Sequence, residues 1–219
     1  DLCVGVDLGM KNIAATSEGI IYKDKDFLAR RRKLRFLKRQ LKSKGTKSAL
    51  KHKKKLRNKE LNQSNDFSHR LTNAILKDTE ANVIVLEDLK HIKKKTCKKN
   101  NKKFNNKIVE RTFNNRWSQI PVRKIQTTLE YKAVLHKKRI CYVNPANTSQ
   151  INSLTNKKDG IRNKGRYMCE DNKTLHSDIN ASINIANRSK LPLSGDNVER
   201  QKALFGQAVV NRPIVHKQQ

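Results

Sequence analysis

The chain has 219 residues, of which 50 are Lys or Arg and only 19 are Asp or Glu, and its formal net charge is +31. This length accommodates one sizeable α/β domain with an insert, and the charge favours nucleic acid as the partner, because neutralising phosphates releases counterions. The rival partner, an anionic membrane, gains no support from a spanning segment, since no stretch approaches the roughly 18 apolar residues that one requires.

The N-terminal segment predicts three consecutive antiparallel strands. Residues 2–8 form an apolar run, and the runs 13–16 and 19–22 follow it. Ser17-Glu18-Gly19 lies between the second and third runs, and two strands around a tight turn form a hairpin.

Three helices are expected next, over about residues 24–43, 48–61 and 67–79. In the first, leucines at positions 34, 37 and 41 lie on one helical face. Lys44-Gly45-Thr46-Lys47 interrupts the helical pattern, and Asn65-Asp66 provides a cap for the third helix.

The first two of these helices carry dense basic faces. Charges of nearly one sign on neighbouring helices repel each other unless an anion lies between them. We therefore interpret residues 24–62 as a helical hairpin insert that lies along a phosphate backbone, with Arg30, Arg31 and Lys38 as expected contacts. A solvated hairpin without a ligand is the alternative.

The second half of the chain begins with residues 83–87, an apolar run typical of a strand covered on both faces. Residues 90–113 predict a flexible basic loop. The lysines expected to contact nucleic acid in this loop are Lys93, Lys94, Lys95, Lys98 and Lys99.

A helix over residues 114–136 is expected to contain the single tryptophan, Trp117. We interpret Trp117 as an anchor in the core, with stacking on a base as the alternative. The expected elements that follow are a strand at 140–143, a polar irregular segment at 144–175, a helix from Asp178 within residues 176–189, and a tail at 190–219.

This order of elements is that of an RNase H-like α/β fold, in which a mixed sheet is flanked by helices. Residues 1–150 are expected to form its core, including the helical insert and the basic loop.

Three carboxylates stand at the ends of these elements. Asp7 closes the first strand, Glu87 closes the strand at 83–87, and Asp178 opens the last helix. Magnesium prefers oxygen ligands, and two-metal sites cleave phosphodiesters. We therefore predict a pair of Mg²⁺ ions, with Mn²⁺ as a substitute, and expect the basic surroundings to lower the three carboxyl pKa values so that all three are ionised.

Each carboxylate also has a structural alternative. Asp7 could be a turn residue, and the Asp-Leu-Gly at Asp7 also begins actin-like and sugar-kinase ATPases, but the sequence has no second glycine-rich phosphate loop. Glu87 could pair with Lys90, and Asp178 could cap its helix. The order Asp, Glu, Asp, with the last opening a helix, argues against a DDE transposase. All three carboxylates occurring in this order favours a metal site.

Three segments resemble the RuvC motifs of the TnpB (OrfB) transposon-encoded nucleases and of the miniature type V CRISPR effectors. Gly5-Val6-Asp7-Leu8-Gly9 resembles the first motif, residues 83–89 the second and residues 178–185 the third. The resemblance runs from about residue 2 to 188, and it also includes Phe67-Ser68-His69, Trp117, residues 130–133 and residues 143–150. By position, Asp7, Glu87 and Asp178 correspond to the metal-binding catalytic triad.

The resemblance implies an RNA-guided DNA endonuclease with a RuvC-like site. Its implied partners are a guide RNA transcribed from the transposon end and the target DNA. The family's N-terminal guide-binding region is absent and the chain starts at Asp1, in a core strand, so we expect a fragment or a processed product. The alternatives are a cleavage-deficient RNA-guided DNA-binding protein and a decayed transposon remnant.

The resemblance also implies a zinc ribbon, expected here over residues 151–175. The four matching positions are Ile151, Leu154, Cys169 and Asn172. A structural zinc site needs four ligands, so we expect no zinc in this degenerate ribbon and an apolar contact in its place. Two cations of this segment, Arg162 and Arg166, are expected to contact nucleic acid.

The four cysteines are scattered along the chain at positions 3, 97, 141 and 169. This spacing indicates reduced thiols and not a disulfide framework. With no signal peptide in the sequence, a cytoplasmic protein of a prokaryote is expected, one that associates with the nucleoid when it acts.

Overall fold

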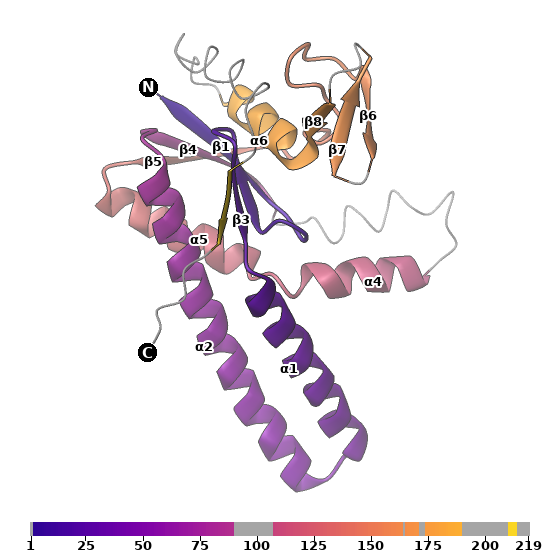
Figure 1. Cartoon of the computed structure of the whole chain (residues 1–219). Coiled ribbons are helices and arrows are strands. Elements are labelled where there is room, and N and C mark those ends of the chain that lie inside the picture. The colour runs from indigo at the N-terminus through magenta and orange to yellow at the C-terminus, as the bar shows by residue number, and fades with distance from the viewer. Residues whose placement is uncertain (1, 90–106, 164, 171–173, 190–209, 214–219) are drawn as a thin grey trace.

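The computed structural model describes residues 2–89, 107–163, 165–170, 174–189 and 210–213 (Figure 1). The strands are β1 (Cys3–Leu8), β2 (Ala14–Thr16), β3 (Ile20–Lys23), β4 (Val83–Glu87), β5 (Arg139–Val143), β6 (Gly160–Asn163), β7 (Arg166–Cys169), β8 (Thr174–His176) and β9 (Val210–Pro213). The helices are α1 (Lys25–Lys44), α2 (Lys47–Asp78), α4 (Lys107–Trp117), α5 (Val122–Leu135) and α6 (Ser177–Asn187).

The larger sheet is mixed and has six strands in the order β5-β4-β1-β2-β3-β9. The predicted antiparallel trio β1-β2-β3 is confirmed, and β4 and β5 extend it with parallel pairing. The register of β1 and β4 pairs Cys3 with Val83 and Val6 with Leu86. The mixed α/β class expected from the sequence is thus observed.

Helices cover both faces of this sheet, which explains why its central strands are apolar throughout. On one face, Val4 and Val6 join the core formed with α5 and the C-terminal half of α2. On the other face, Cys3 of β1 and Val85 of β4 pack with Ile185 of α6.

Gly5 brings α6 into direct contact with β1. A Cβ atom at position 5 would lie 2.0 Å from the backbone oxygen of Ser182 and 2.6 Å from the nitrogen of Ala186. Only glycine allows so close an approach of helix to strand.

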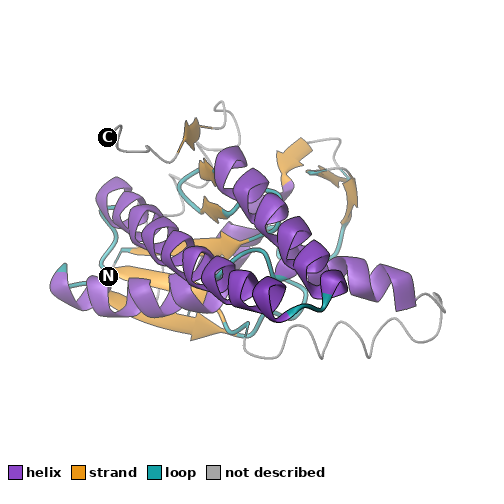
Figure 2. Ribbon diagram, turned by 90° about the horizontal axis from the view of Figure 1, so that it is seen from below, coloured by secondary structure: helices purple, strands orange, loops and turns teal. Residues whose placement is uncertain are grey.

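A long helical hairpin, α1 and α2, projects from the sheet (Figures 1 and 2). The sequence predicted two helices where the structure has the single 32-residue helix α2, so the hairpin helix extends beyond residue 62 and Asn65-Asp66 caps nothing. Continuity follows from packing, because the buried residues Ser64, Phe67 and Leu71 continue one helical stripe through this point.

The seam between α1 and α2 holds both aromatic and charged contacts. Near the sheet, Phe27 stacks on Phe67 with ring centroids 3.9 Å apart. Farther out, Glu60 pairs with Arg31, at 2.8 Å from Nη1, and with Lys38. The hairpin is therefore held by a small charged cluster in its middle.

The predicted helix at 114–136 is two helices. α4 ends at Trp117, and α5 starts at Val122 after a turn that contains Pro121. Proline lacks a backbone N–H and fixes its own φ, so it stands just before the second helix instead of inside one. Helix α4 also occupies part of the predicted loop at 90–113, and residues 90–106 lie outside the described residues.

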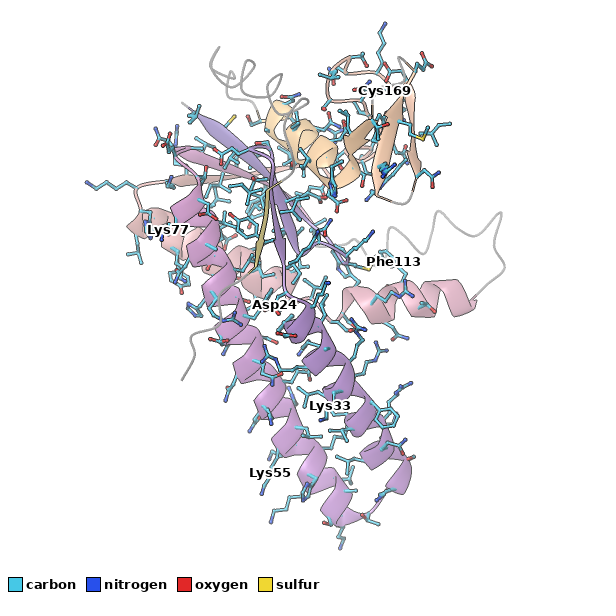
Figure 3. All side chains as sticks on the ribbon, viewed as in Figure 1. Asp24, Lys33, Lys55, Lys77, Phe113 and Cys169 are labelled. Atoms are coloured by element: carbon cyan, nitrogen blue, oxygen red, sulfur yellow. The ribbon has the colours of Figure 1, made fainter. Side chains whose placement is uncertain are left out.

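Residues 144–175, predicted to be irregular, contain most of a second sheet with the order β6-β7-β8. Tyr167 is fully buried in its small core, together with Cys169 and Leu175 (Cys169 is labelled in Figure 3). Gly160 makes room for the ring of Tyr167, since a Cβ there would lie 2.6 Å from a ring carbon. These strands are short and pair across turns, so no apolar run in the sequence marks them.

The predicted tail at 190–219 contributes the strand β9, which pairs in parallel with β3 at the edge of the larger sheet. The rest of that segment lies outside the described residues. No helix in the part of the chain that the structure describes has both the length and the apolar character needed to cross a membrane.

Candidate functional site

The three predicted carboxylates converge at one end of the larger sheet. Because Val6 pairs with Leu86 in parallel strands, Asp7 and Glu87 follow at the same ends of neighbouring strands. Asp178 lies in the first turn of α6, which Gly5 holds against β1. The cap of α6 is His176, whose Nδ1 accepts from the N–H of Asp178, so Asp178 does not serve as the N-cap.

Burial and neighbouring charges perturb the pKa values of two of these carboxylates. Burial raises the pKa of Asp7 well above its usual value, and the charges of Glu87 and Asp178 raise it further, while Arg162 opposes them. Burial also raises the pKa of Glu87, against the hydrogen bond from Thr148 and the charge of Arg188. The expectation of lowered pKa values was wrong for these two residues, because burial outweighs the basic surroundings.

Hydrogen bonds hold Asp178 by both of its oxygens. Asn12 donates from Nδ2 to Oδ2 at 2.7 Å, and Arg162 donates from Nη2 to Oδ1 at 2.8 Å. The hydroxyl of Ser177 also donates to Oδ1, at 3.1 Å.

Glu87 is held by Thr148, which donates from Oγ1 to Oε1 at 2.5 Å. The segment that carries Thr148 is itself fixed by α6: Asn184 donates from Nδ2 to the carbonyl oxygens of Thr148 and Ile151 at 2.8 and 2.6 Å. Asn180 adds a third such bond, to Ile151, at 2.7 Å. The helix that carries Asp178 therefore also positions the partner of Glu87.

Sequence reasoning gave no role to Asn12, Thr148 or Asn184. Thr148 lies in a segment that carries the family resemblance, and Asn184 lies in the third motif. Asn12 follows the first motif by only a few residues. Membership in these segments could have identified Thr148 and Asn184, and only closeness to the first motif could have identified Asn12, because the partners of all three are distant along the chain.

The donor set fits a hard divalent cation in its chemistry. Carboxylate oxygens are the ligands that Mg²⁺ and Mn²⁺ prefer, and a cation would relieve the mutual repulsion that acts on Asp7. Among the residues that the structure describes, however, no three His, Cys, Asp or Glu side chains are spaced to hold a metal ion together. Arg162 and Asn12 occupy the Asp178 oxygens that a cation would need.

The predicted nucleic-acid contacts have different positions. Arg30 and Arg166 are exposed, and Arg162 lies on Asp178. Arg31 is buried, pairs with Glu60 and donates to the carbonyl of Gln119, so it stabilises the hairpin and is not presented to a ligand, contrary to the prediction. Lys38 faces the same seam. Lys93, Lys94, Lys95, Lys98 and Lys99 lie outside the described residues.

The positions expected to correspond to zinc ligands do not form a zinc site. Ile151 and Leu154 have no ligand atom, and the thiol of Cys169 is buried beside Tyr167. Asn172 lies outside the described residues. An apolar cluster is present as expected, but Tyr167, Cys169 and Leu175 form it, whereas Leu154 is 40% exposed.

A family model described as "Cas12f1-like, TNB domain" matches residues 123–185. This segment includes most of α5, the strand β5, the second sheet and most of α6. Over this segment the chain is similar to the Cas12f1-like family, one of the miniature type V effectors that the three motifs resemble. The relationship inferred from the three motifs is thereby confirmed. Comparison with curated proteins gives no match.

Two solved structures of Cas12f complexes share the fold. The "Cas12f1-sgRNA-target DNA complex" aligns with a TM-score of 0.57 at 20% identity, over 86% of this chain and 50% of that one. The "CRISPR-Cas12f Ternary Complex" aligns with a TM-score of 0.62 at 21% identity, over 87% of this chain and 39% of that one. The chain thus spans half or less of the length of these two effectors.

Proposed function

We propose that this chain carries the catalytic unit of an RNA-guided DNA endonuclease of the TnpB type. Its partners would be a guide RNA and target DNA, as in the complexes that share its fold. The strand order β5-β4-β1-β2-β3, with β2 antiparallel to β1, supports an RNase H-like core, and residues 151–175 would be a zinc ribbon without its zinc.

The convergence of three carboxylates carries this proposal. Asp7, Glu87 and Asp178 come from three elements far apart in the sequence, yet the charges of the other two raise the pKa of Asp7. A protein of net charge +31 has little structural reason to gather carboxylates, and clustered, perturbed carboxylates are typical of functional sites.

Asp7, Glu87 and Asp178 would hold two Mg²⁺ ions only after a rearrangement that brings the three carboxylates closer together and frees an oxygen of Asp178. When bound, such ions activate water as a nucleophile and stabilise the charge that develops on the phosphate. Thr148 orients Glu87, and Asn12 orients Asp178. Arg162 balances Asp178 in this conformation, and its guanidinium would turn to a phosphate oxygen of the strand once a cation takes its place.

A cleavage-deficient binding protein is the second candidate, because the zinc ligands expected from the family are missing. The structure weakens this argument: the second sheet has its own core around Tyr167, so losing the ligands does not require losing the module. The module also places Arg162 on the candidate catalytic residue Asp178.

The test is cleavage of DNA by the full-length protein together with RNA from its own locus, with and without Mg²⁺. We expect metal-dependent cutting that Asp7→Asn abolishes, with substitution of the exposed Lys77 by Gln as the matched surface control. Guide-dependent DNA binding without cutting would support the second candidate. Neither binding nor cutting would refute both and leave the decayed remnant.

A further inference from the structure

A cavity of about 300 Å³ opens between the end of β4 and the start of α5. Its apolar wall is formed by Leu89, Trp117, Ile120 and Val122. Two cationic side chains, Arg123 and Lys124, form part of its polar side, and the remaining lining residues are Ser118, Pro121 and Gln126.

The walls of this cavity are fixed by contacts on three sides. Phe113 stacks on Trp117, with ring centroids 6.1 Å apart and nearly parallel planes. The buried Arg31 of α1 donates to the carbonyl of Gln119 at 3.0 Å, which ties the turn to the helical hairpin. Gln126 donates to the carbonyl of Glu87 at 2.9 Å, which ties α5 to the strand that carries the carboxylate.

The cations of the cavity are available to a ligand. Arg123 and Lys124 are both exposed, and within the part of the chain that the structure describes neither forms an ion pair. An aromatic and aliphatic wall beside free cations suits a ligand with a flat apolar part and an anionic part. The volume lies at the low end of small-ligand pockets, which excludes a duplex.

We propose that this cavity binds one nucleotide of a single-stranded nucleic acid. The base packs against the exposed edges of Trp117 and Val122, which are otherwise buried in the core as expected for Trp117, and the phosphate contacts Arg123 and Lys124. Gln126 donates to the backbone carbonyl of Glu87, so the cavity lies near the end of β4, and we expect the bound strand to continue toward the carboxylates. In this respect the inference extends the proposed function, although nucleotide binding itself needs neither metal nor cleavage.

The only tryptophan of the chain lines this cavity, so its fluorescence reports on the ligand directly. The 219-residue chain is titrated, without metal, with a short oligothymidylate, with the matching oligouridylate and with inorganic phosphate. We expect saturable quenching by an oligonucleotide and none by phosphate at the same phosphate concentration. The two oligonucleotides show whether the strand is DNA or RNA.

Paired substitutions distinguish binding at this cavity from nonspecific attraction of the oligonucleotide to the net positive charge of the protein. Arg123→Gln with Lys124→Gln should raise the oligonucleotide concentration at half-maximal quenching about tenfold or more, since two phosphate contacts are lost. Lys77→Gln with Lys137→Gln removes the same charge near the far end of α5 and should change it little; Figure 3 shows Lys77 well away from Phe113. Ser118→Leu narrows the cavity without changing the charge, and it should also lower the affinity for the oligonucleotide.

Three outcomes would overturn the inference: no quenching by either oligonucleotide, equal effects of the two double substitutions, or full quenching by phosphate alone. Asp7→Asn separates the inference from the proposed function, because it should abolish cleavage and leave the quenching unchanged. If the unsubstituted protein cuts no DNA but its tryptophan is quenched as described, the proposed function fails and the cavity assignment stands.

Discussion

At the scale of single residues, Asp7 is in an environment that resists its own ionisation. It is partly buried, and two other carboxylates act on it. Arg162 offsets this effect only in part. Without a cation, the site therefore lowers the stability of the fold at neutral pH.

The raised pKa of Asp7 predicts how the stability of the metal-free protein changes with pH. The folded protein keeps this proton at pH values where the unfolded chain has lost it, so this contribution to stability is present below the ordinary carboxyl pKa, about 4, and is lost as pH rises through the raised value. Urea unfolding at a series of pH values should show this loss, and Mg²⁺ should reverse it.

Asp7→Asn is the control, because its amide does not titrate in this range. Subtracting its profile isolates Asp7 from the other acidic groups. Parallel profiles for the two proteins would show that the folded structure does not perturb Asp7.

Thr148 permits a second prediction at this scale. Thr148→Val keeps the shape of the side chain but removes the donor to Glu87. Mutating a residue that hydrogen-bonds a metal ligand typically lowers metal affinity 10- to 100-fold, so we expect the substitution to weaken Mg²⁺ binding by about tenfold or more. The measurement is the Mg²⁺ concentration at which thermal stabilisation is half complete, and Thr148→Ser should restore the original value.

At the scale of elements, the sequence predicted the strands and carboxylates better than the helix boundaries. Asp7 and Glu87 follow apolar runs, and such a run indicates a strand without knowledge of its tertiary contacts. Their placement at strand ends could therefore be predicted from the sequence. The continuity of α2 could not, because Asn65-Asp66 reads as a cap unless the contacts of Phe67 with Phe27 are known. The second sheet depends on Tyr167, whose partners come from separate strands.

The hairpin seam gives the prediction for this scale. Glu60 is the shared partner of Arg31 and Lys38, and its side chain is only 22% exposed. Glu60→Gln should lower the free energy of unfolding by about 1–2 kcal/mol, because two cations lose their charged partner. The loss is smaller than for a fully buried pair, since the seam is partly accessible to water.

Asp66→Asn is the matched control, since its side chain is 66% exposed and pairs with Arg70 one turn away. Such a surface pair is worth about 0.3–0.5 kcal/mol. Denaturant unfolding measures both variants. Equal losses would mean that the seam cluster contributes no more than a surface pair.

At the scale of the whole molecule, the second sheet has an apolar core of its own, formed by Tyr167, Cys169 and Leu175. The carbonyl of Gln150 accepts from the hydroxyl of Tyr167 at 3.1 Å, so this core is also joined to the segment that precedes it. Zinc-dependent modules unfold when the metal is removed. This chain should behave differently from relatives that keep four zinc ligands.

We therefore predict that a zinc-selective chelator leaves the thermal unfolding midpoint of this protein unchanged. Tyr167→Leu should lower that midpoint, because it leaves part of the core empty and removes the hydroxyl donor. Metal analysis of the purified protein provides the independent check. Stoichiometric zinc, or a lower midpoint with the chelator, would contradict the prediction.

The continuity of α2 also sets a length. The exposed half of the helix, residues 47–63, measures about 25 Å at 1.5 Å per residue, which equals about seven nucleotide steps along one strand of B-form DNA. Since no break separates this half from the half that packs under the sheet, a strand bound there would be held at a constant distance from the carboxylates. Hydroxyl-radical footprinting should then show a protected segment of about seven nucleotides at a fixed offset from the cut, and an offset that varies among targets would refute this.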